Sequence, residues 1–442
     1  MILIESCRRV AVMDDAGTEL ADASILIDKG TIAWVGKGKP PAQGDVERID
    51  GRGLVAIPGL INTHHHLYQV LTRARAQEQG LFGWLKELYP VWAHVDREWE
   101  RSAALIGLAE LALSGCSTSV DHHYVFPRGV DGLLEAEIDA AKAVGLRFHP
   151  CRGSMDLGES QGGLPPDSIV QDLDTILSDT EAAIRRFHDP STGSMLQIAV
   201  GPCSPFSVSD RLMRESVTLA RKHQVRLHTH IAETTDEQAF CQEKFGRRPI
   251  QLLEDFGFLG DDVWLAHCVH ADASDIALLA KTKTGVAWCP TSNARLGSGI
   301  APSRRLLDAR VPLGLSVDGS ASNDGNQMLG EVRQGMLVTR AVNGAQSMTA
   351  REALRVATRG GAACLGRDDI GSLEVGKRAD LALFTVDEPG YIGAETDPIA
   401  ALVFCAPTAV RHLFVEGRQV VADGRLATLD ASRLRSPLTV PA

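Results

Sequence analysis

The stretch VAIPGLINTHHH, residues 55–66, combines an apolar run with three consecutive histidines. The apolar part has the composition of a strand that enters a buried sheet. Because side chains alternate between the two faces of a strand, His64 and His66 point to one side and His65 to the other. Two imidazoles on one face can bind a single ion. We therefore expect His64 and His66 to be metal ligands and His65 to face away, with a polar strand end that binds nothing as the competing interpretation.

The composition is that of a soluble globular protein. The chain has 442 residues, of which 44% are hydrophobic and 23% are charged. This length suffices for one large domain, or for a large and a small one. A net charge of −11, without notable clusters of Lys and Arg, argues against a nucleic-acid partner.

The spacing of the cysteines and the N-terminal residues indicate the expected cellular compartment. The nine cysteines are scattered from Cys7 to Cys405 without C-x-x-C pairs, which is typical of reduced thiols rather than of disulfides. The start MILIESCRRV has no apolar core of a signal peptide, and no uncharged apolar run has the length of a membrane span. We expect a cytoplasmic protein without a membrane partner.

The pattern of apolar and polar residues changes twice along the chain. Short alternating bursts such as ASILIDKGTIAWVG fill the first part, and similar bursts such as ADLALFTV return near the end. Between them, apolar strands alternate with long helical patterns. We predict a small β-sandwich domain formed by both chain ends, residues 1–57 and 370–442, and a large domain over residues 58–369.

The large domain contains eight strand candidates that alternate with helical segments such as REWERSAALIGLAELALSG. Eight such units over roughly 310 residues favour an α/β fold of the (β/α)₈ TIM-barrel type. A doubly wound open sheet is the alternative. The candidates are GLINTHHH (59–66), CSTSVDHH (116–123), LRFHPCRG (146–153), LQIAVGPC (196–203), VRLHTHIAE (225–233), DVWLAHCVH (262–270), TGVAWCPTSN (284–293) and VPLGLSVDGS (311–320).

Active sites of such barrels lie at the carboxyl ends of the strands. In addition to the histidines of the first strand, the fifth ends with His230 and Glu233, the sixth with His267 and the eighth with Asp318. Three imidazoles and one carboxylate, from His64, His66, His230 and Asp318, suit a divalent ion at an open catalytic site.

The remaining polar residues have expected roles in hydrolysis. Glu233 lies near the rim, where it could pass a proton from water to a substrate nitrogen, and His267 could stabilise charge or orient the nucleophile. Asp318 could also act as a base. Taken singly, Asp318 could be a turn residue and a strand histidine a core residue, and we assign His228 to the core. The coincidence of four strand ends favours a metal site.

The ordered series PGLINTHHH, HTHIAET, AHCVH and SVDGSASND resembles the amidohydrolase superfamily, in its mononuclear-metal aminohydrolase branch. IGSLEVGKRADLALF, residues 370–384, is similar to the segment that returns such chains to their small domain. The resemblance implies the same metal ligands, with Glu233 as the proton shuttle and His267 as the histidine of strand six. No lysine ends strand four, which disfavours a binuclear site bridged by a carbamylated lysine.

Further stretches, among them HHHLYQVLTRA and VDGSASNDGNQMLGEVR, are similar to bacterial 8-oxoguanine deaminases and their s-triazine hydrolase relatives. This resemblance implies that Gln69 and Cys203 contact the ring of the substrate, although packing alone explains a cysteine at this position. His123, or its neighbour His122, ends strand two within reach of the same place. LFGWLKELYPVW (81–92) supplies aromatic residues that either cover the substrate or fill the core.

These observations lead to one expected activity. The chain should use one divalent ion, Zn²⁺ or alternatively Fe²⁺, to deaminate a purine-like heterocycle hydrolytically, with 8-oxoguanine and water giving urate and ammonia. The alternatives are an s-triazine amino- or chlorohydrolase, a deaminase of another guanine-like or pterin ring, and a barrel without catalysis. The expected partner is a small molecule, and a homo-oligomer remains open.

Overall fold

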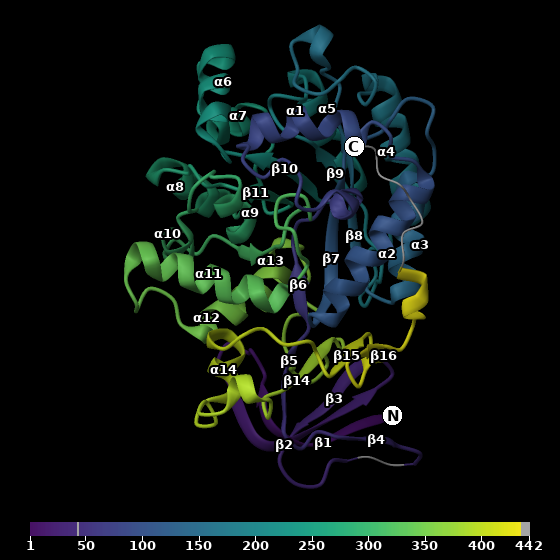
Figure 1. Ribbon diagram of the computed structural model, residues 1–442, viewed down its shortest axis with the longest axis vertical. Coiled ribbons are helices and arrows are strands. Elements are labelled where there is room, and N and C mark those ends of the chain that lie inside the picture. The colour runs from purple at the N-terminus through teal and green to yellow at the C-terminus, as the bar shows by residue number, and fades with distance from the viewer. Residues whose placement is uncertain (42–43, 435–442) are drawn as a thin grey trace.

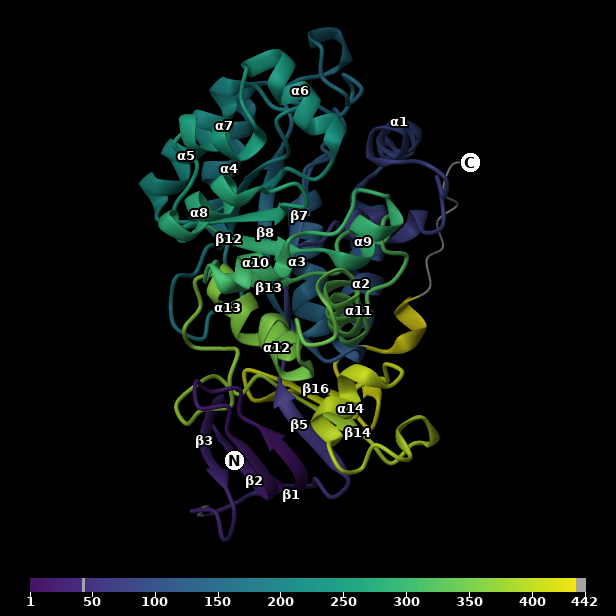
Figure 2. The ribbon, with the colours of Figure 1, turned by 90° about the vertical axis from the view of Figure 1, so that its left-hand side faces the viewer.

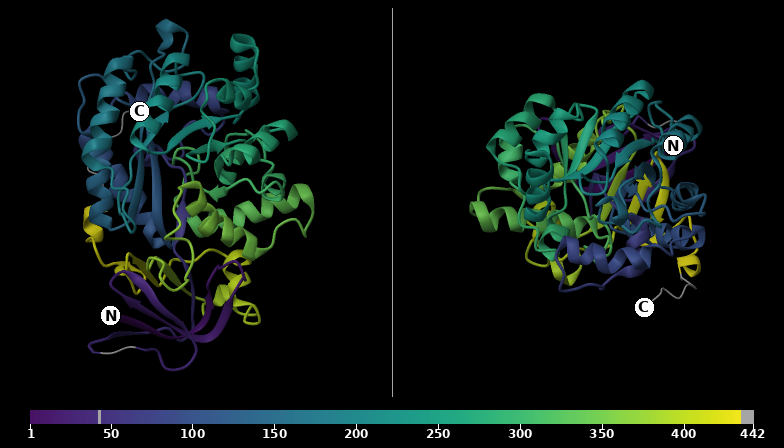
Figure 3. Two further views of the ribbon diagram at one scale, coloured as in Figure 1. Left: turned by 180° about the vertical axis from the view of Figure 1, so that it is seen from behind. Right: turned by 90° about the horizontal axis from the view of Figure 1, so that it is seen from above.

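The computed structural model describes residues 1–41 and 44–434. Residues 42–43 and 435–442, which belong to the predicted small domain, lie outside the described residues. Figure 1 shows two bodies: a barrel surrounded by helices, and a sheet beneath it that both ends of the chain build. Figure 2 and the left view of Figure 3 show the same division from the side and from behind.

Eight parallel strands close into a barrel, in the order β10-β11-β12-β13-β6-β7-β8-β9. This closure confirms the predicted (β/α)₈ fold and excludes the open sheet. The right view of Figure 3 shows the barrel from above. The strands are β6 (Leu60–Asn62), β7 (Cys116–His123), β8 (Arg147–Ser154), β9 (Ala199–Pro202), β10 (Leu227–Ile231), β11 (Val263–His267), β12 (Gly285–Trp288) and β13 (Leu313–Leu315).

Helices follow the strands and cover the barrel. Several begin where a side chain accepts a hydrogen bond from a free backbone N–H, as Asp96 does for α2 and Ser209 for α5. The helices of the barrel are α1 (Leu81–Trp92), α2 (Arg97–Leu113), α3 (Leu133–Val144), α4 (Leu173–Phe187), α5 (Asp210–His223), α6 (Thr235–Phe245), α7 (Pro249–Asp255), α8 (Ala273–Thr282), α9 (Pro290–Arg295), α10 (Ser303–Asp308), α11 (Met328–Asn343), α12 (Ala350–Arg355) and α13 (Gly361–Cys364).

Several strands end earlier than the sequence pattern predicts. β6 stops at Asn62 and β13 at Leu315, so the polar residues that follow lie on the first turns beyond the strands. Four non-glycine residues at such ends have positive φ angles: Ala232 at 51°, His267 at 72°, Cys268 at 50° and Asp318 at 64°. This backbone conformation is costly for residues with a Cβ atom and is concentrated at functional sites.

The small domain is a single nine-stranded sheet, in contrast to the two separate sheets of a typical sandwich. The sheet curls so that the backbone of Thr31 pairs with that of Arg378, and Gly417 packs closely against Gly30. Its two halves therefore enclose an apolar core as a sandwich does. The strands are β1 (Ile2–Ala11), β2 (Glu19–Asp28), β3 (Thr31–Gly36), β4 (Glu47–Asp50), β5 (Leu54–Pro58), β14 (Leu381–Thr385), β15 (His412–Val415), β16 (Arg418–Ala422) and β17 (Arg425–Leu426), and α14 (Pro398–Phe404) accompanies them.

A buried ion pair joins the two bodies. Arg147 of β8 is fully buried, and its guanidinium donates to both carboxylate oxygens of Asp380, each at 3.1 Å. The same guanidinium reaches Glu416 at 2.9 Å and donates to the backbone carbonyls of Gly193 and Ser194. In the part of the chain that the structure describes, no helix is long and apolar enough to cross a membrane.

We predict that Arg147→Met lowers the free energy of unfolding by about 3–5 kcal/mol, because it leaves the buried Asp380 carboxylate without its partner. Urea denaturation followed by circular dichroism measures this loss. Arg186→Met is the matched control, because Arg186 pairs with Glu135 at the surface and its removal should cost less than about 1 kcal/mol. Equal small losses in both variants would contradict the proposed role of Arg147.

Candidate metal centre and active site

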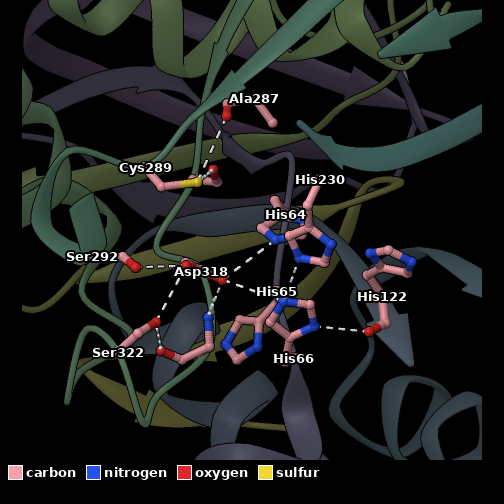
Figure 4. A network of polar contacts seen from close by, with 12 residues as sticks. His64, His65, His66, His122, His230, Ala287, Cys289, Ser292, Asp318 and Ser322 are labelled. Carbon is pink, nitrogen blue, oxygen red and sulfur yellow. Dashed lines mark hydrogen bonds and ion pairs between the residues drawn. The ribbon is translucent and has the colours of Figure 1, made fainter. Parts of the chain in front are cut away.

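His64 and His66 follow β6 and lie on one side of the chain, among the carboxyl ends of the barrel strands. Figure 4 shows both near His230 and Asp318. His65 lies outside this group: its Nε2 is 2.8 Å from Oδ1 of Asn326. All three histidines are buried.

Backbone carbonyls fix the protonation of two of these imidazoles. Nδ1 of His66 is 2.8 Å from the carbonyl oxygen of His122, and Nδ1 of His230 is 2.8 Å from that of Cys203. A carbonyl can only accept, so each Nδ1 carries the proton and each Nε2 has a free lone pair. The two Nε2 atoms are 3.1 Å apart. Two lone pairs thus face each other in a buried place, which is unfavourable unless a cation lies near them.

A chain of two hydrogen bonds fixes His64 in the same way. Nδ1 of His228 is 2.8 Å from the carbonyl oxygen of Trp264 and therefore donates to it. Nε2 of His228 must then accept from Nδ1 of His64, 2.7 Å away. Nε2 of His64 consequently has a lone pair, and it has no hydrogen-bond partner among the described residues.

Asp318 brings negative charge to these three lone pairs. Its Oδ1 is 3.3 Å from Nε2 of His64 and 3.4 Å from Nε2 of His66. Oδ2 accepts from the hydroxyls of Ser292 and Ser322 at 2.6 and 3.2 Å. Burial raises the pKa of the Asp318 carboxyl, but a hydrogen bond or positive charge from His64, together with positive charge at His267 and His66, outweighs burial and holds the pKa well below its usual range. With neutral imidazoles, a bound cation would have to supply that positive charge.

This donor set fits a divalent metal ion. Three neutral imidazole nitrogens and one ionised carboxylate oxygen converge, and each imidazole is oriented by a hydrogen bond from its other nitrogen, as in metal sites of known proteins. His64 also belongs to two groups whose possible ligand atoms lie within 4.8 Å of one another, one with His122 and His230 and one with His267 and Asp318.

Glu233 and His267 lie beside this centre. Oε2 of Glu233 is 3.5 Å from Nε2 of His267, and both residues are almost fully buried. The side chain of Glu237 holds the turn that carries Glu233, because its two oxygens accept from the backbone N–H groups of Ala232 and Glu233 at 2.9 and 2.8 Å. The side-chain amide of Asn293 donates to Nδ1 of His267 at 3.0 Å, which leaves Nε2 of His267 as the donor toward the centre.

A small cavity opens on the metal centre. The volume open to the centres of water molecules is about 30 Å³, which is enough for at least one ordered water. Gln69 and Cys203 line it, whereas His123 does not. α1 covers one side, so its apolar residues contribute to the cavity as well as to the core. The lining includes His66, Gln69, Leu81, Trp84, Leu85, Tyr89, Tyr124, Cys203, His230, Glu233 and Asp318.

His123 therefore does not lie where the sequence analysis expected it. Its Nδ1 is 3.4 Å from Glu100 and 3.5 Å from Glu137, on the outer side of β7. The neighbouring His122 faces the barrel interior, and its ring stacks on that of His230 with the centroids 4.9 Å apart. Alternation along the strand separates the two histidines. His122 faces the barrel interior, but it does not line the cavity either.

Sequence reasoning also missed several supporting residues. His228 was assigned to the core, although its spacing of two from His230 placed it on the same face of the strand. Ser292, Ser322 and Asn293 carry no signal of their own, because their importance depends on contacts with Asp318 and His267 that are distant in sequence. Glu237 lies four residues after Glu233, in the first turn of α6, where a carboxylate can reach free backbone N–H groups.

The geometry can now be compared with known proteins. A model of the amidohydrolase family matches residues 55–420. The chain belongs to the amidohydrolase family. An 8-oxoguanine deaminase from Pseudomonas aeruginosa is 46% identical over 427 residues, which cover 96% of this chain and 95% of that protein. A hydroxydechloroatrazine ethylaminohydrolase from a Pseudomonas species is 37% identical, with 95% and 91% of the two chains covered.

A solved structure of this amidohydrolase group agrees over the whole fold. The atrazine chlorohydrolase from Arthrobacter aurescens TC1, complexed with zinc, superposes with a TM-score of 0.94 at 36% identity and covers 98% of each chain. The chain is thus an amidohydrolase whose relatives are hydrolases and deaminases of heterocycles, and the predicted enzyme class is confirmed.

We predict that His66→Ala lowers the bound metal by one equivalent relative to the wild type, because it removes one of the converging lone pairs. His65→Gln is the matched control: its amide can still donate to Asn326, and its metal content should equal that of the wild type. Elemental analysis after dialysis measures both. Loss of metal in the His65 variant alone would mean that the wrong face of the strand was assigned.

Proposed function

We propose that the enzyme deaminates 8-oxoguanine hydrolytically, giving urate and ammonia, with one divalent ion held by His64, His66, His230 and Asp318. The convergence of three imidazole lone pairs with an ionised carboxylate carries the metal part of the proposal. The identity of 46% with an 8-oxoguanine deaminase over nearly the whole chain supports the substrate. Zinc is the proposed ion because a relative of the same fold contains it, and Fe²⁺ is the alternative.

When bound there, a divalent ion would lower the pKa of water enough to supply hydroxide at neutral pH. The protein's own residues then manage protons and charge. Glu233 is buried beside the centre, and burial together with the charges of Asp318 and Glu237 raises the pKa of its carboxyl well above the usual range. It can therefore donate a proton to a ring nitrogen and later help to protonate the leaving amine.

His267 and Asp318 complete the reaction. Nε2 of His267 can donate a hydrogen bond where negative charge develops on oxygen. The carboxylate of Asp318 can accept the proton that the attacking water gives up. The bond between the ring carbon and its exocyclic nitrogen breaks, a carbonyl forms, and ammonia leaves.

Gln69 is the proposed contact to the substrate ring. It is fully buried in the cavity wall, and its Oε1 has no hydrogen-bond partner among the described residues. The side-chain amide could pair with a ring N–H and a ring carbonyl together. Cys203 lies on the same cavity, with its sulfur 4.0 Å from Nδ1 of His230, so it supplies a polarisable wall next to a proposed metal ligand.

We predict that the zinc-loaded enzyme releases ammonia from 8-oxoguanine and forms urate in equal amount. The panel should also contain guanine, isoxanthopterin, cytosine, hydroxyatrazine and atrazine. Ammonia is measured by a coupled assay, urate by absorbance, and loss of the triazines, which release alkylamine or chloride, by chromatography. Turnover of an s-triazine with none of 8-oxoguanine would retain the metal chemistry and reject the proposed substrate. A triazine substrate is the second candidate because of the triazine-hydrolysing relatives.

We predict that Glu233→Gln lowers kcat by about 100-fold or more, because the amide cannot transfer a proton. The metal content should not change, since Glu233 is not a proposed ligand. Glu243→Gln, the same substitution at an exposed position of α6, is the control and should leave kcat unchanged. Near-full activity of the Glu233 variant would refute the proposed proton transfer.

A further inference from the structure

A second group of potential metal ligands lies outside the barrel interior. Glu100 of α2, His123 of β7 and Glu137 of α3 are each fully buried. Figure 1 shows α2 and α3 beside β7 and β8. Nδ1 of His123 and one carboxylate oxygen of each glutamate all lie within 4.8 Å of one another. The proposed chemistry uses none of these three residues.

The tautomer of His123 is fixed as in the catalytic centre. Its Nε2 is 2.8 Å from the carbonyl oxygen of Val125 and must donate to it. Nδ1 therefore has a lone pair, which faces Oε2 of Glu100 at 3.4 Å and Oε1 of Glu137 at 3.5 Å. In the described part of the chain, neither this nitrogen nor any of the four carboxylate oxygens has a hydrogen-bond partner.

The local charges are not balanced by the protein. No lysine or arginine among the described residues forms an ion pair with Glu100 or Glu137. Asp121, a third buried carboxyl nearby, accepts from the backbone N–H of Leu67 at 2.6 Å. Its carboxyl also interacts with that of Glu137, and this interaction contributes to the raised pKa of Glu137. Burial, together with the nearby carboxyls, raises the pKa of Glu100 and Glu137 well above the usual range, so both glutamates take up protons unless a cation is present.

The distances around Nδ1 of His123 favour a shared cation over a hydrogen bond from either glutamate. An O–H···N hydrogen bond would bring its oxygen and nitrogen to roughly 2.6–3.0 Å. The observed separations of 3.4 and 3.5 Å are longer. Two ligand atoms bound at about 2.1 Å to one tetrahedral ion lie about 3.4 Å apart. The same pattern, a nitrogen lone pair facing a carboxylate oxygen at 3.3–3.4 Å, marks the catalytic centre.

We propose that Glu100, His123 and Glu137 form a second, structural site for a divalent metal ion such as Zn²⁺. The ion neutralises two buried carboxylates and ties β7 to α2 and α3. The placement of β7 matters for the catalytic centre, because His122, next to His123 on this strand, orients His66 through its carbonyl and stacks on His230. The site does not depend on the proposed substrate.

Anomalous diffraction from crystals of the wild-type protein, grown after loading with zinc, tests the site without any variant. Data on both sides of the zinc absorption edge should show two peaks, one among His64, His66 and His230 and one among Glu100, His123 and Glu137. The catalytic peak is the internal control for loading. A catalytic peak with no density peak at the second position would overturn the proposal.

Metal stoichiometry gives an independent result. The wild type should bind two equivalents of zinc, and the double variant Glu100→Gln with Glu137→Gln should bind one, because amides keep the volume but remove both charges. This variant should retain zinc-dependent turnover, whereas loss of the catalytic ion should abolish it. A fully loaded, active wild type that contains one equivalent would refute the second site while leaving the proposed function intact.

Discussion

The active centre depends on hydrogen bonds that imidazole N–H groups donate to backbone carbonyls. The carbonyls of His122 and Cys203 accept a hydrogen bond from Nδ1 of His66 and of His230. The carbonyl of Trp264 accepts one from His228, whose other nitrogen accepts from Nδ1 of His64. The opposite nitrogens of His66, His230 and His64 are thereby left as lone pairs that point at one place. Such an arrangement is unfavourable by itself and becomes favourable when a cation is present. The barrel backbone therefore orients the proposed metal ligands before any metal binds.

Closure of the barrel makes this arrangement possible. His64, His230 and Asp318 are separated by long stretches of sequence, but parallel strands bring their carboxyl ends to one rim. The rim is also where the chain departs from ordinary strand geometry, since Ala232, His267 and Asp318 all have positive φ angles. Glu237 and the serines beside Asp318 hold these turns by hydrogen bonds, so the strained backbone and the metal centre form one unit.

The sequence predicts the parts of this architecture that depend on local periodicity. Alternation separates His65 from His64 and His66, and the apolar runs locate all eight strands of the barrel. The sequence does not determine which of His122 and His123 faces inward, because that depends on how β7 pairs with its neighbours. The pairing of β6 with β7 shifts register between Leu60 and Ile61, where β7 has one extra residue. Contacts between distant segments, such as Asn293 with His267 or Glu100 with His123, likewise leave no pattern in a single sequence. For the same reason the curled single sheet of the small domain could not be distinguished from two stacked sheets.

We propose that this amidohydrolase needs a metal ion to activate water. Turnover of 8-oxoguanine should be measured in chelator-treated protein whose metal content has been verified, before and after zinc is added back. We expect turnover to fall by about 1000-fold or more without metal, because the imidazoles and Asp318 alone cannot lower the pKa of water, and to return with zinc. Full turnover by verified metal-free protein would contradict the account.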